Sequence, residues 1–148
     1  MSTPLRFPMF FDLTGRRVVV AGCGNIALRR IRVLLDFGAD VTVVAPEAKE
    51  LPEGTHWISR GYETGDLAGA FLAVAATNSR EVNHLIGVDA GKAGIPVSVA
   101  DCREECTFFF PAICKTDSLV AGVVSDGFDH SKTARAARAI RSVMEELP

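Results

Sequence analysis

One stretch decides the fold: VVVAGCGNIA, residues 18–27. An apolar run typical of a buried strand ends at Ala21, a glycine turn follows, and a helical pattern continues from Ala27 to Phe37. A strand, a glycine turn and a helix in this order form a site where a dinucleotide pyrophosphate is held. The turn therefore predicts a nucleotide-binding βαβ unit near the start of the chain.

Each small residue of the turn has its own expected role. Gly22 permits the tight turn, Gly24 lets backbone N–H groups approach the phosphates, and Ala27 allows close packing of helix on strand. The N-terminus of the helix then faces the anion. The cofactor-binding residues expected in this turn are Gly22, Cys23, Gly24, Asn25 and Ile26.

The second strand of the unit is expected over residues 40–45, and its end departs from a common NAD-binding pattern. Where a carboxylate often binds the ribose 2′-hydroxyl, the chain has Ala45, followed by Pro46 and Glu47. Either Glu47 or backbone groups here hold the adenosine ribose, or the glycine turn binds nothing. Because no arginine occupies 45–48 to meet a 2′-phosphate, we expect NAD to be preferred over NADP.

Composition bounds the class of protein. At 148 residues and 48% hydrophobic, the chain can form one principal core without disulfides or a metal. A net charge of −2 gives no field that would attract nucleic acid. The longest apolar runs are strand-sized and the N-terminus lacks a secretory pattern, so we expect neither a membrane span nor export. A cytoplasmic protein is the expectation.

The four cysteines are not spaced like a zinc framework, which needs close pairs of the CxxC kind. Reduced thiols and no bound metal are therefore expected. Cys102 and Cys106 are four residues apart, which on a helix would bring both thiols to one face. A metal or redox pair at these two positions is the alternative.

Basic residues gather before Asp36, and Arg29 and Arg30 lie within the first expected helix. Ile31, Leu34 and Leu35 already define its buried stripe, which leaves the arginines off the core. They form either a solvated helix face or an electropositive rim that suits a polyanionic substrate.

Further elements continue the α/β pattern. Strands are expected at 56–58, with Trp57 packed, and at 71–76 and 95–100, with a single helical turn at 66–70. A helix is expected at 80–93, and its apolar face comprises Val82, Leu85, Ile86, Ala90 and Ala93. Thr77 and Asp101 follow strands at the sheet edge where ligands collect.

The pattern changes after Asp101. Two β-like runs, 107–113 and 119–124, flank a hairpin-sized turn, and a helix is expected over 131–147. The hairpin is apolar on both faces, which predicts burial against a second copy and hence a homodimer. The predicted fold class is α/β: a Rossmann-type doubly wound parallel sheet in an NAD-binding domain, 1–106, followed by a hairpin and helix dimerisation unit, 107–148.

Longer blocks are more specific than the glycine turn. They are MFFDL at 9–13, VVAPE at 43–47, GDLAGAF at 65–71, AATN at 75–78, VSVAD at 97–101 and CTFFFPA at 106–112. With them the chain resembles, over about residues 8–145, the precorrin-2 dehydrogenase family, the NAD-dependent module of siroheme synthases. The resemblance implies oxidation of precorrin-2 by NAD to sirohydrochlorin, the last step before iron insertion gives siroheme.

The resemblance also implies site residues. The family's aspartate after the fifth strand, a general base that also takes part in metal chelation, matches Asp101, and its serine at the hairpin exit matches Ser125. Similar proteins bind NAD without an acid at position 45, using the turn at Asn25-Ile26 and the loop at Pro46-Glu47. The substrate-binding residues expected are Arg29, Arg30 and Ser125, and Thr77 joins those expected to bind the cofactor.

The chain departs from the family at its C-terminal part. The exit SGGxSP is replaced by SDGFDHSK at 125–132, and the family's further helical segment is absent before Pro148. Iron insertion, which bifunctional members perform in the same cleft, is therefore the activity in doubt, and a separate ferrochelatase is the expected partner. The alternatives to an enzyme are a non-catalytic NAD-binding sensor and a structural subunit.

Overall fold

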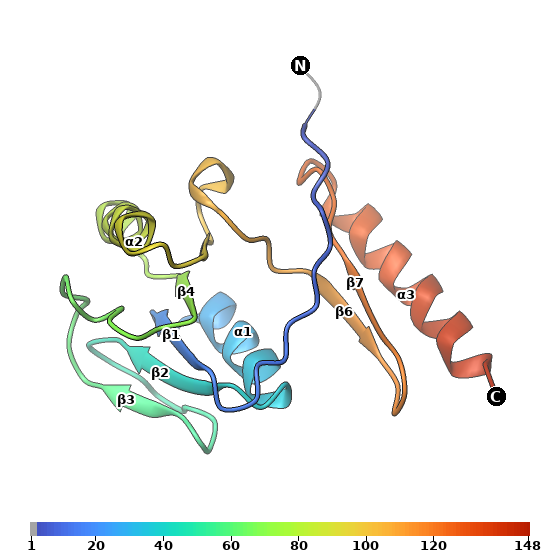
Figure 1. Cartoon of the computed structure of the whole chain (residues 1–148), viewed down its shortest axis with the longest axis horizontal. Coiled ribbons are helices and arrows are strands. Elements are labelled where there is room, and N and C mark those ends of the chain that lie inside the picture. Colours follow the sequence, from blue (N-terminus) through green and yellow to red (C-terminus); the bar gives the residue numbers. More distant parts are fainter. Residues whose placement is uncertain (1–2) are drawn as a thin grey trace. The chain divides into compact units, whose positions relative to one another are not determined.

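The computed structural model describes residues 3–148, which form two compact units. One unit is Phe11–Phe108, and the other combines residues 3–10 with Phe109–Pro148. Figure 1 shows the elements of both units along the chain. The functional division into 1–106 and 107–148 stays a prediction.

The unit Phe11–Phe108 is built on a five-stranded parallel sheet with the order β3-β2-β1-β4-β5. Its strands are β1 (Arg17–Ala21), β2 (Asp40–Val44), β3 (His56–Ile58), β4 (Leu72–Ala75) and β5 (Val97–Val99), and its helices are α1 (Asn25–Asp36), α2 (Arg80–Ala93) and the short 3₁₀ helix η1 (Arg103–Glu105). The predicted strands and long helices of this unit are all present: β3 and α2 have the predicted bounds, and the ends of the others differ by at most two residues.

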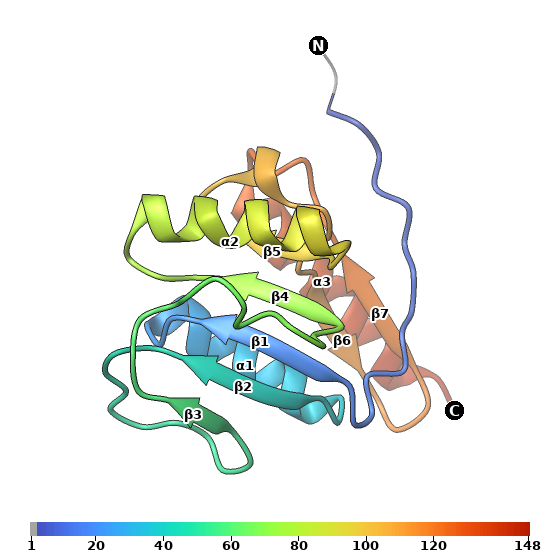
Figure 2. The ribbon, with the colours of Figure 1, turned by 60° about the vertical axis from the view of Figure 1, so that its left-hand side comes forward.

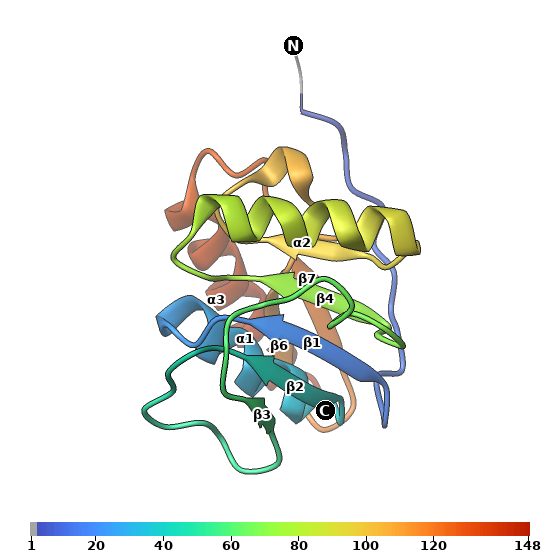
Figure 3. The same cartoon turned by 90° about the vertical axis from the view of Figure 1, so that its left-hand side faces the viewer.

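The strand order makes this sheet doubly wound. From β1 the chain crosses through α1 to β2 on one side, and from β4 it crosses through α2 to β5 on the other. Since both crossovers are right-handed in such sheets, opposite directions place the two helices on opposite faces. Figures 2 and 3 show α1 and α2 on the two sides of the sheet. The order reverses between β1 and β4, which is where open α/β sheets bind ligands.

The core follows strand alternation. Val19 and Ala21 of β1 join a buried cluster with Ile86 and Ala90 of α2. The alternate residues of β1 face the other side, where Ile31 of α1 is fully buried. A central strand that is apolar on both faces is therefore the feature that lets one sheet carry a helix on each side.

Four details of the prediction for this unit were wrong. Trp57 is 45% exposed, because β3 is an edge strand with no further strand to cover it. Leu85 and Ala93 are exposed as well, and Asn83 is buried in their place. Residues 66–70 form consecutive hydrogen-bonded turns rather than a helical turn.

The second unit contains a β-hairpin and one helix. Strands β6 (Ala112–Lys115) and β7 (Val120–Val123) pair antiparallel, and α3 (His130–Glu146) packs on them. The thiol of Cys114 donates to the Ala137 carbonyl, 3.2 Å away, which ties the hairpin to the helix. The hairpin prediction is confirmed, but its first strand starts at Ala112, because Pro111 has no N–H to give to the ladder. Over residues 3–148, no helix combines the length and the apolar character that crossing a membrane requires.

Candidate functional site

The glycine turn lies where β1 meets the loop after β4. Gly22 has φ +109°, and a Cβ placed on it would lie 2.2 Å from the carbonyl oxygen of Ala76. Its N–H donates to the Val44 carbonyl, 2.9 Å away. Only glycine fits this position, because the backbone of the neighbouring loop occupies the space a side chain would need and the backbone angle disfavours other residues.

Gly24 is different, since a Cβ there would meet no atom within 4 Å. Gly24 is the N-cap of α1 and carries no side chain to cap it, and the first turn contains no acidic residue. The first hydrogen bond of the helix is the one that the Leu28 N–H donates to the Gly24 carbonyl. The N–H groups of Asn25, Ile26 and Ala27 have no acceptor within the helix, and over residues 3–148 no backbone hydrogen bond from them to another residue is formed. An anion fits here.

The loop after β4 is held in place by a buried amide. Asn83, on α2, accepts through Oδ1 from the backbone N–H and the hydroxyl of Thr77, at 3.0 and 2.7 Å. Its Nδ2 donates to the Thr77 carbonyl, 3.1 Å away. Asn83 thus fixes the backbone that faces Gly22. The Thr77 side chain serves its own loop, so its role toward a cofactor stays a prediction.

The backbone groups just after β2 also form hydrogen bonds within the protein. The N–H of Ala45 donates to the Ile58 carbonyl, and the indole Nε1 of Trp57 donates to the Ala45 carbonyl, 2.9 Å away. Ala45 is buried, whereas Pro46 and Glu47 are exposed. The contacts with an adenosine ribose, predicted for this strand end, would therefore come mainly from Pro46 and Glu47.

Asp101 follows β5 and forms an ion pair with Arg80 at the start of α2. The Arg80 NH1 donates to Oδ1 of Asp101, 2.8 Å away, and both side chains remain partly exposed. Within residues 3–148, no residue donates a hydrogen bond to the second carboxylate oxygen, Oδ2. A carboxylate at this edge with one oxygen held and one open can accept a proton.

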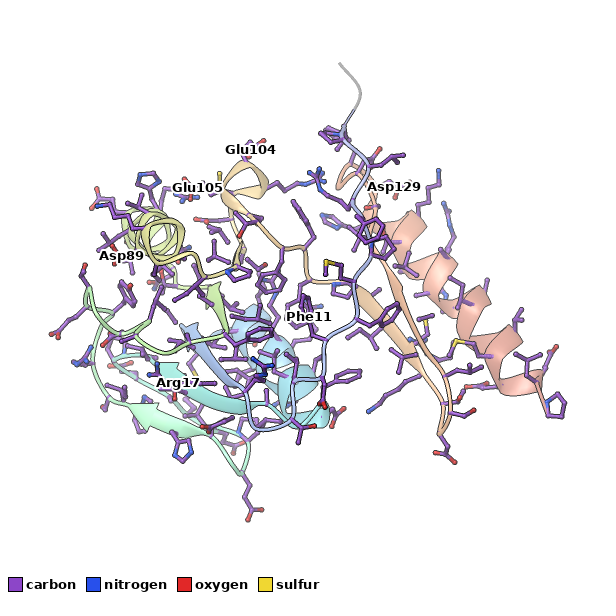
Figure 4. All side chains as sticks on the ribbon, viewed as in Figure 1. Phe11, Arg17, Asp89, Glu104, Glu105 and Asp129 are labelled. Carbon is purple, nitrogen blue, oxygen red and sulfur yellow. The ribbon has the colours of Figure 1, made fainter. Side chains whose placement is uncertain are left out.

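The ion pair continues into η1. The other terminal nitrogen of Arg80 binds Glu105 Oε2 at 2.5 Å, and the Nδ1 of His84 lies 2.7 Å from Glu105 Oε1. Figure 4 labels Glu105 on η1, beside α2. The hydrogen bond with His84, followed by that with Arg80, holds the pKa of Glu105 below its ordinary value, against the effect of desolvation. Arg80, Glu105 and His84 were not singled out for the site from the sequence.

The two arginines of α1 differ in surroundings. Arg29 is exposed, whereas Arg30 is partly buried and donates to the Ser98 hydroxyl on β5, 3.1 Å away. Burial lowers the pKa of Arg30, although the guanidinium stays charged at neutral pH. Arg29 is therefore the more accessible cation for a substrate, and binding by either stays a prediction.

Ser125 belongs to the second unit, at the exit from β7. Its hydroxyl accepts from the Gly127 N–H, 3.0 Å away, and the Asp126 carboxylate accepts from the Phe128 N–H. These bonds are ordinary turn contacts. A role toward the substrate stays a prediction.

The thiols have local partners. Cys106 Sγ accepts from the Val99 N–H and donates to the Val99 carbonyl, while Cys102 Sγ contacts the Glu104 carboxylate at 3.5 Å. All four cysteines are free, and no group of three or more His, Cys, Asp or Glu over residues 3–148 is arranged to hold a metal ion. Cys102 and Cys106 are separated by η1 rather than joined by an α-helix, so the expected common helix face does not form.

Comparison with known proteins bears on the same residues. A family model named NAD_binding_7, with the description "Putative NAD(P)-binding", matches residues 9–112. Among curated proteins, the "Probable multifunctional siroheme biosynthesis protein HemA" of Ruminiclostridium josui is 47% identical over 145 residues, 93% of this chain and 28% of that protein. The siroheme synthase of Azotobacter vinelandii is 44% identical over 138 residues, 89% of this chain and 30% of that protein.

A solved structure resembles the whole fold. "SirC, precorrin-2 dehydrogenase" aligns with a TM-score of 0.75 and 28% identity, covering 93% of this chain and 71% of that one. The chain spans 28% and 30% of the length of the two curated relatives named above.

Proposed function

Because this chain belongs to the NAD(P)-binding family that residues 9–112 match, we propose that it is an NAD-dependent dehydrogenase that converts precorrin-2 to sirohydrochlorin. The observation that carries the cofactor half of this proposal is the uncapped N-terminus of α1, where the N-cap is Gly24, a Cβ on it would meet no atom within 4 Å, and the first turn contains no acidic residue. The likeness to a precorrin-2 dehydrogenase over 93% of the chain supports the substrate half.

The residues of the turn fit a dinucleotide. The N–H groups of Asn25 and Ile26, with the positive end of the α1 dipole, hold the pyrophosphate, and Gly22, Cys23 and Gly24 shape the turn. Glu47 accepts from the ribose hydroxyls, and its charge disfavours a 2′-phosphate, so NAD is selected over NADP. Tighter binding of NADP than of NAD in calorimetry would contradict this selection.

The chemistry removes two hydrogens from the macrocycle. When bound, NAD supplies the acceptor for the hydride and leaves as NADH. The macrocycle also loses a proton, which the Oδ2 of Asp101 accepts and passes to water. Arg29 and Arg30 attract the carboxylates of the tetrapyrrole, with Ser125 as a further substrate contact. A separate ferrochelatase takes the product.

Assembly is part of the proposal. The hairpin and α3 carry exposed apolar side chains: Leu119, Val120, Val124, Phe128 and Val143. Exposed apolar side chains favour burial against a second copy of the chain, so the active form is a homodimer. Light scattering that gives a monomer at micromolar concentration would contradict the dimer.

The four free cysteines suit a protein of the reducing cytoplasm.

The test is to incubate the protein with precorrin-2 and NAD and to follow the absorbance of product and NADH. We expect turnover by the wild type, and a loss of roughly 10²- to 10⁴-fold in Asp101→Ala with NAD affinity retained. Asp117→Ala, which removes an exposed carboxylate from the hairpin turn, is the control and should keep full activity. NAD binding without turnover by the wild type would favour the sensor.

A further inference from the structure

We propose that Arg80 is a positioning residue for Asp101: it fixes one carboxylate oxygen and leaves the other open toward the substrate. This inference rests on the proposed function, in which Asp101 accepts the proton. The pairing itself is a property of the structure, so the two can be tested apart.

The geometry is a fork with a different carboxylate on each branch. NH1 of Arg80 donates to Asp101 Oδ1 at 2.8 Å, and NH2 donates to Glu105 Oε2 at 2.5 Å. Because both terminal nitrogens of a planar guanidinium are fixed, its orientation is fixed as well. Asp101 lies in the turn that follows β5, where a free side chain would sample several rotamers. Arg80 therefore determines which rotamer Asp101 adopts.

The fork is anchored at both ends. Arg80 is the first residue of α2, directly after the N-cap Ser79, whose side chain accepts from the Val82 N–H, 3.3 Å away. Glu105 closes η1 and is also held by His84, one turn of α2 further on. The charged or titratable groups that act on Arg80 are Asp101, Cys102 and Glu105, all from the segment after β5. The start of α2 and this segment are thus joined through one guanidinium.

The consequence for catalysis is that the two oxygens of Asp101 have different roles: Oδ1 binds Arg80, and Oδ2 accepts the proton. A general base must lie within hydrogen-bond reach of the proton it removes, so a carboxylate that rotates freely loses rate without losing affinity. Arg80 does not touch the reacting atoms in this proposal. Its effect on turnover passes through Asp101 and should vanish when Asp101 is replaced.

The test compares Arg80→Met, Arg80→Lys and the control Glu81→Gln, which removes an exposed charge one residue away. With precorrin-2 and NAD, we expect Arg80→Met to lower kcat roughly tenfold while KM and the NAD dissociation constant change less than twofold. Arg80→Lys, which keeps the charge but not the fork, should recover part of kcat. In an Asp101→Ala background, Arg80→Met should have no further effect on kcat. Loss in that background equal to the loss in wild type would overturn the proposal.

A second readout does not depend on turnover. The carboxyl ¹³C resonance of Asp101 at neutral pH should move in Arg80→Met and stay in place in Glu81→Gln. Both variants are measured in the 148-residue chain, and their unfolding temperatures show that they are folded. An unchanged resonance in Arg80→Met would overturn the pairing. If the resonance moves in Arg80→Met but the wild-type chain does not oxidise precorrin-2, the proposed function is contradicted and the pairing stands.

Discussion

The N-termini of α1 and α2 follow neighbouring strands of one sheet, yet they end differently. At α1 the N-cap is Gly24, with no side-chain cap and no acid in the first turn. At α2 the N-cap is Ser79, whose hydroxyl accepts from the Val82 N–H, and Glu81 adds a negative charge to the first turn. At the first end the N–H groups of the first turn and the positive end of the helix dipole are available to an external anion. At the second end the Val82 N–H already has Ser79 as its acceptor, and the dipole meets the charge of Glu81.

The difference shows how one scaffold separates binding from stability. A glycine N-cap is less stabilising than a serine or aspartate N-cap by only about a few tenths of a kcal/mol, so the start of α1 is left open to an anion at a small cost in stability. Gly22 and Asn83 keep the starts of the two helices close together. Gly22 lets the loop before α2 lie against the glycine turn, and Asn83 holds that loop through its hydrogen bonds with Thr77. Substitutions at the two ends should therefore have opposite effects on stability and on affinity.

The largest expected effect is that of Gly22→Ala. The new Cβ would lie 2.2 Å from the Ala76 carbonyl at φ +109°, so both the backbone strain and the clash oppose folding. We expect the free energy of unfolding to fall by roughly 3 kcal/mol or more. Gly24→Ala, where nothing lies within 4 Å, is the matched control in urea unfolding and should lose only about 1 kcal/mol or less, the difference between glycine and alanine at an N-cap. Equal losses in the two variants would contradict the described turn.

Next in size is Gly24→Asp, which gives α1 an acidic cap. At φ −77° the residue needs no unusual backbone angle. The carboxylate competes with the pyrophosphate for the same donors and repels it, so NAD affinity should fall by roughly tenfold or more while stability is retained or rises slightly. Calorimetry with NAD measures the first and thermal unfolding the second. Undiminished affinity would show that the anion does not bind at α1.

Ser79→Ala is the opposite test at α2. Loss of the cap leaves the Val82 N–H without its side-chain acceptor, so we expect unfolding to become easier by about 1 kcal/mol. NAD affinity should stay within about twofold of wild type, because α2 holds no phosphate in this account. A large loss of affinity with unchanged stability would reverse the assignment of the two helix ends.

The smallest effect concerns a third helix end, that of α3, where Asp129 accepts from the Lys132 N–H at 3.0 Å. Its hydrogen bonds, first with the Ser131 hydroxyl and then with the Lys132 N–H, lower its pKa from the ordinary 3.8. A lowered pKa stabilises the fold above the unfolded value, and this contribution disappears as pH falls through the folded pKa. Asp129→Ala should therefore lower the unfolding temperature slightly at pH 7 and by less below pH 3.8. Because neither alanine nor asparagine titrates, the difference in unfolding temperature between Asp129→Ala and Asp129→Asn should not change with pH.

Most strands and helices of the Rossmann-type unit could be predicted from the sequence, because the patterns that indicate them are local. The run Val18–Ala21 is apolar on both faces, the glycines follow it directly, and Gly94 stops α2 in the left-handed conformation at φ +68°. The N-cap of α2 was not singled out from the sequence, although a serine before a helix with Glu81 in its first turn is the signal for it. These features depend on neighbours in the chain, where pattern reasoning works.

What the sequence did not supply depends on distant contacts. Asn83 occupies a core-facing helix position that apolar periodicity assigns to its neighbours, and only the closeness of Thr77 explains its burial. An asparagine inside an apolar helix stripe was the available signal. The pairing of Arg80 with Asp101 joins residues 21 apart, so no spacing rule finds it. Trp57 was predicted as packed, yet its strand lies at the sheet edge, a position that only the strand order reveals.

The central claim is that the open N-terminus of α1 holds the pyrophosphate of NAD. The most direct measurement is a titration of the ¹⁵N-labelled protein with NAD, followed through the backbone amide resonances. The account predicts the largest changes in chemical shift at the amides of Asn25, Ile26 and Ala27. The amide of Val82 should change little, because its N–H already donates to the Ser79 side chain. Shifts concentrated at the start of α2, with the amides of residues 25–27 unmoved, would contradict it.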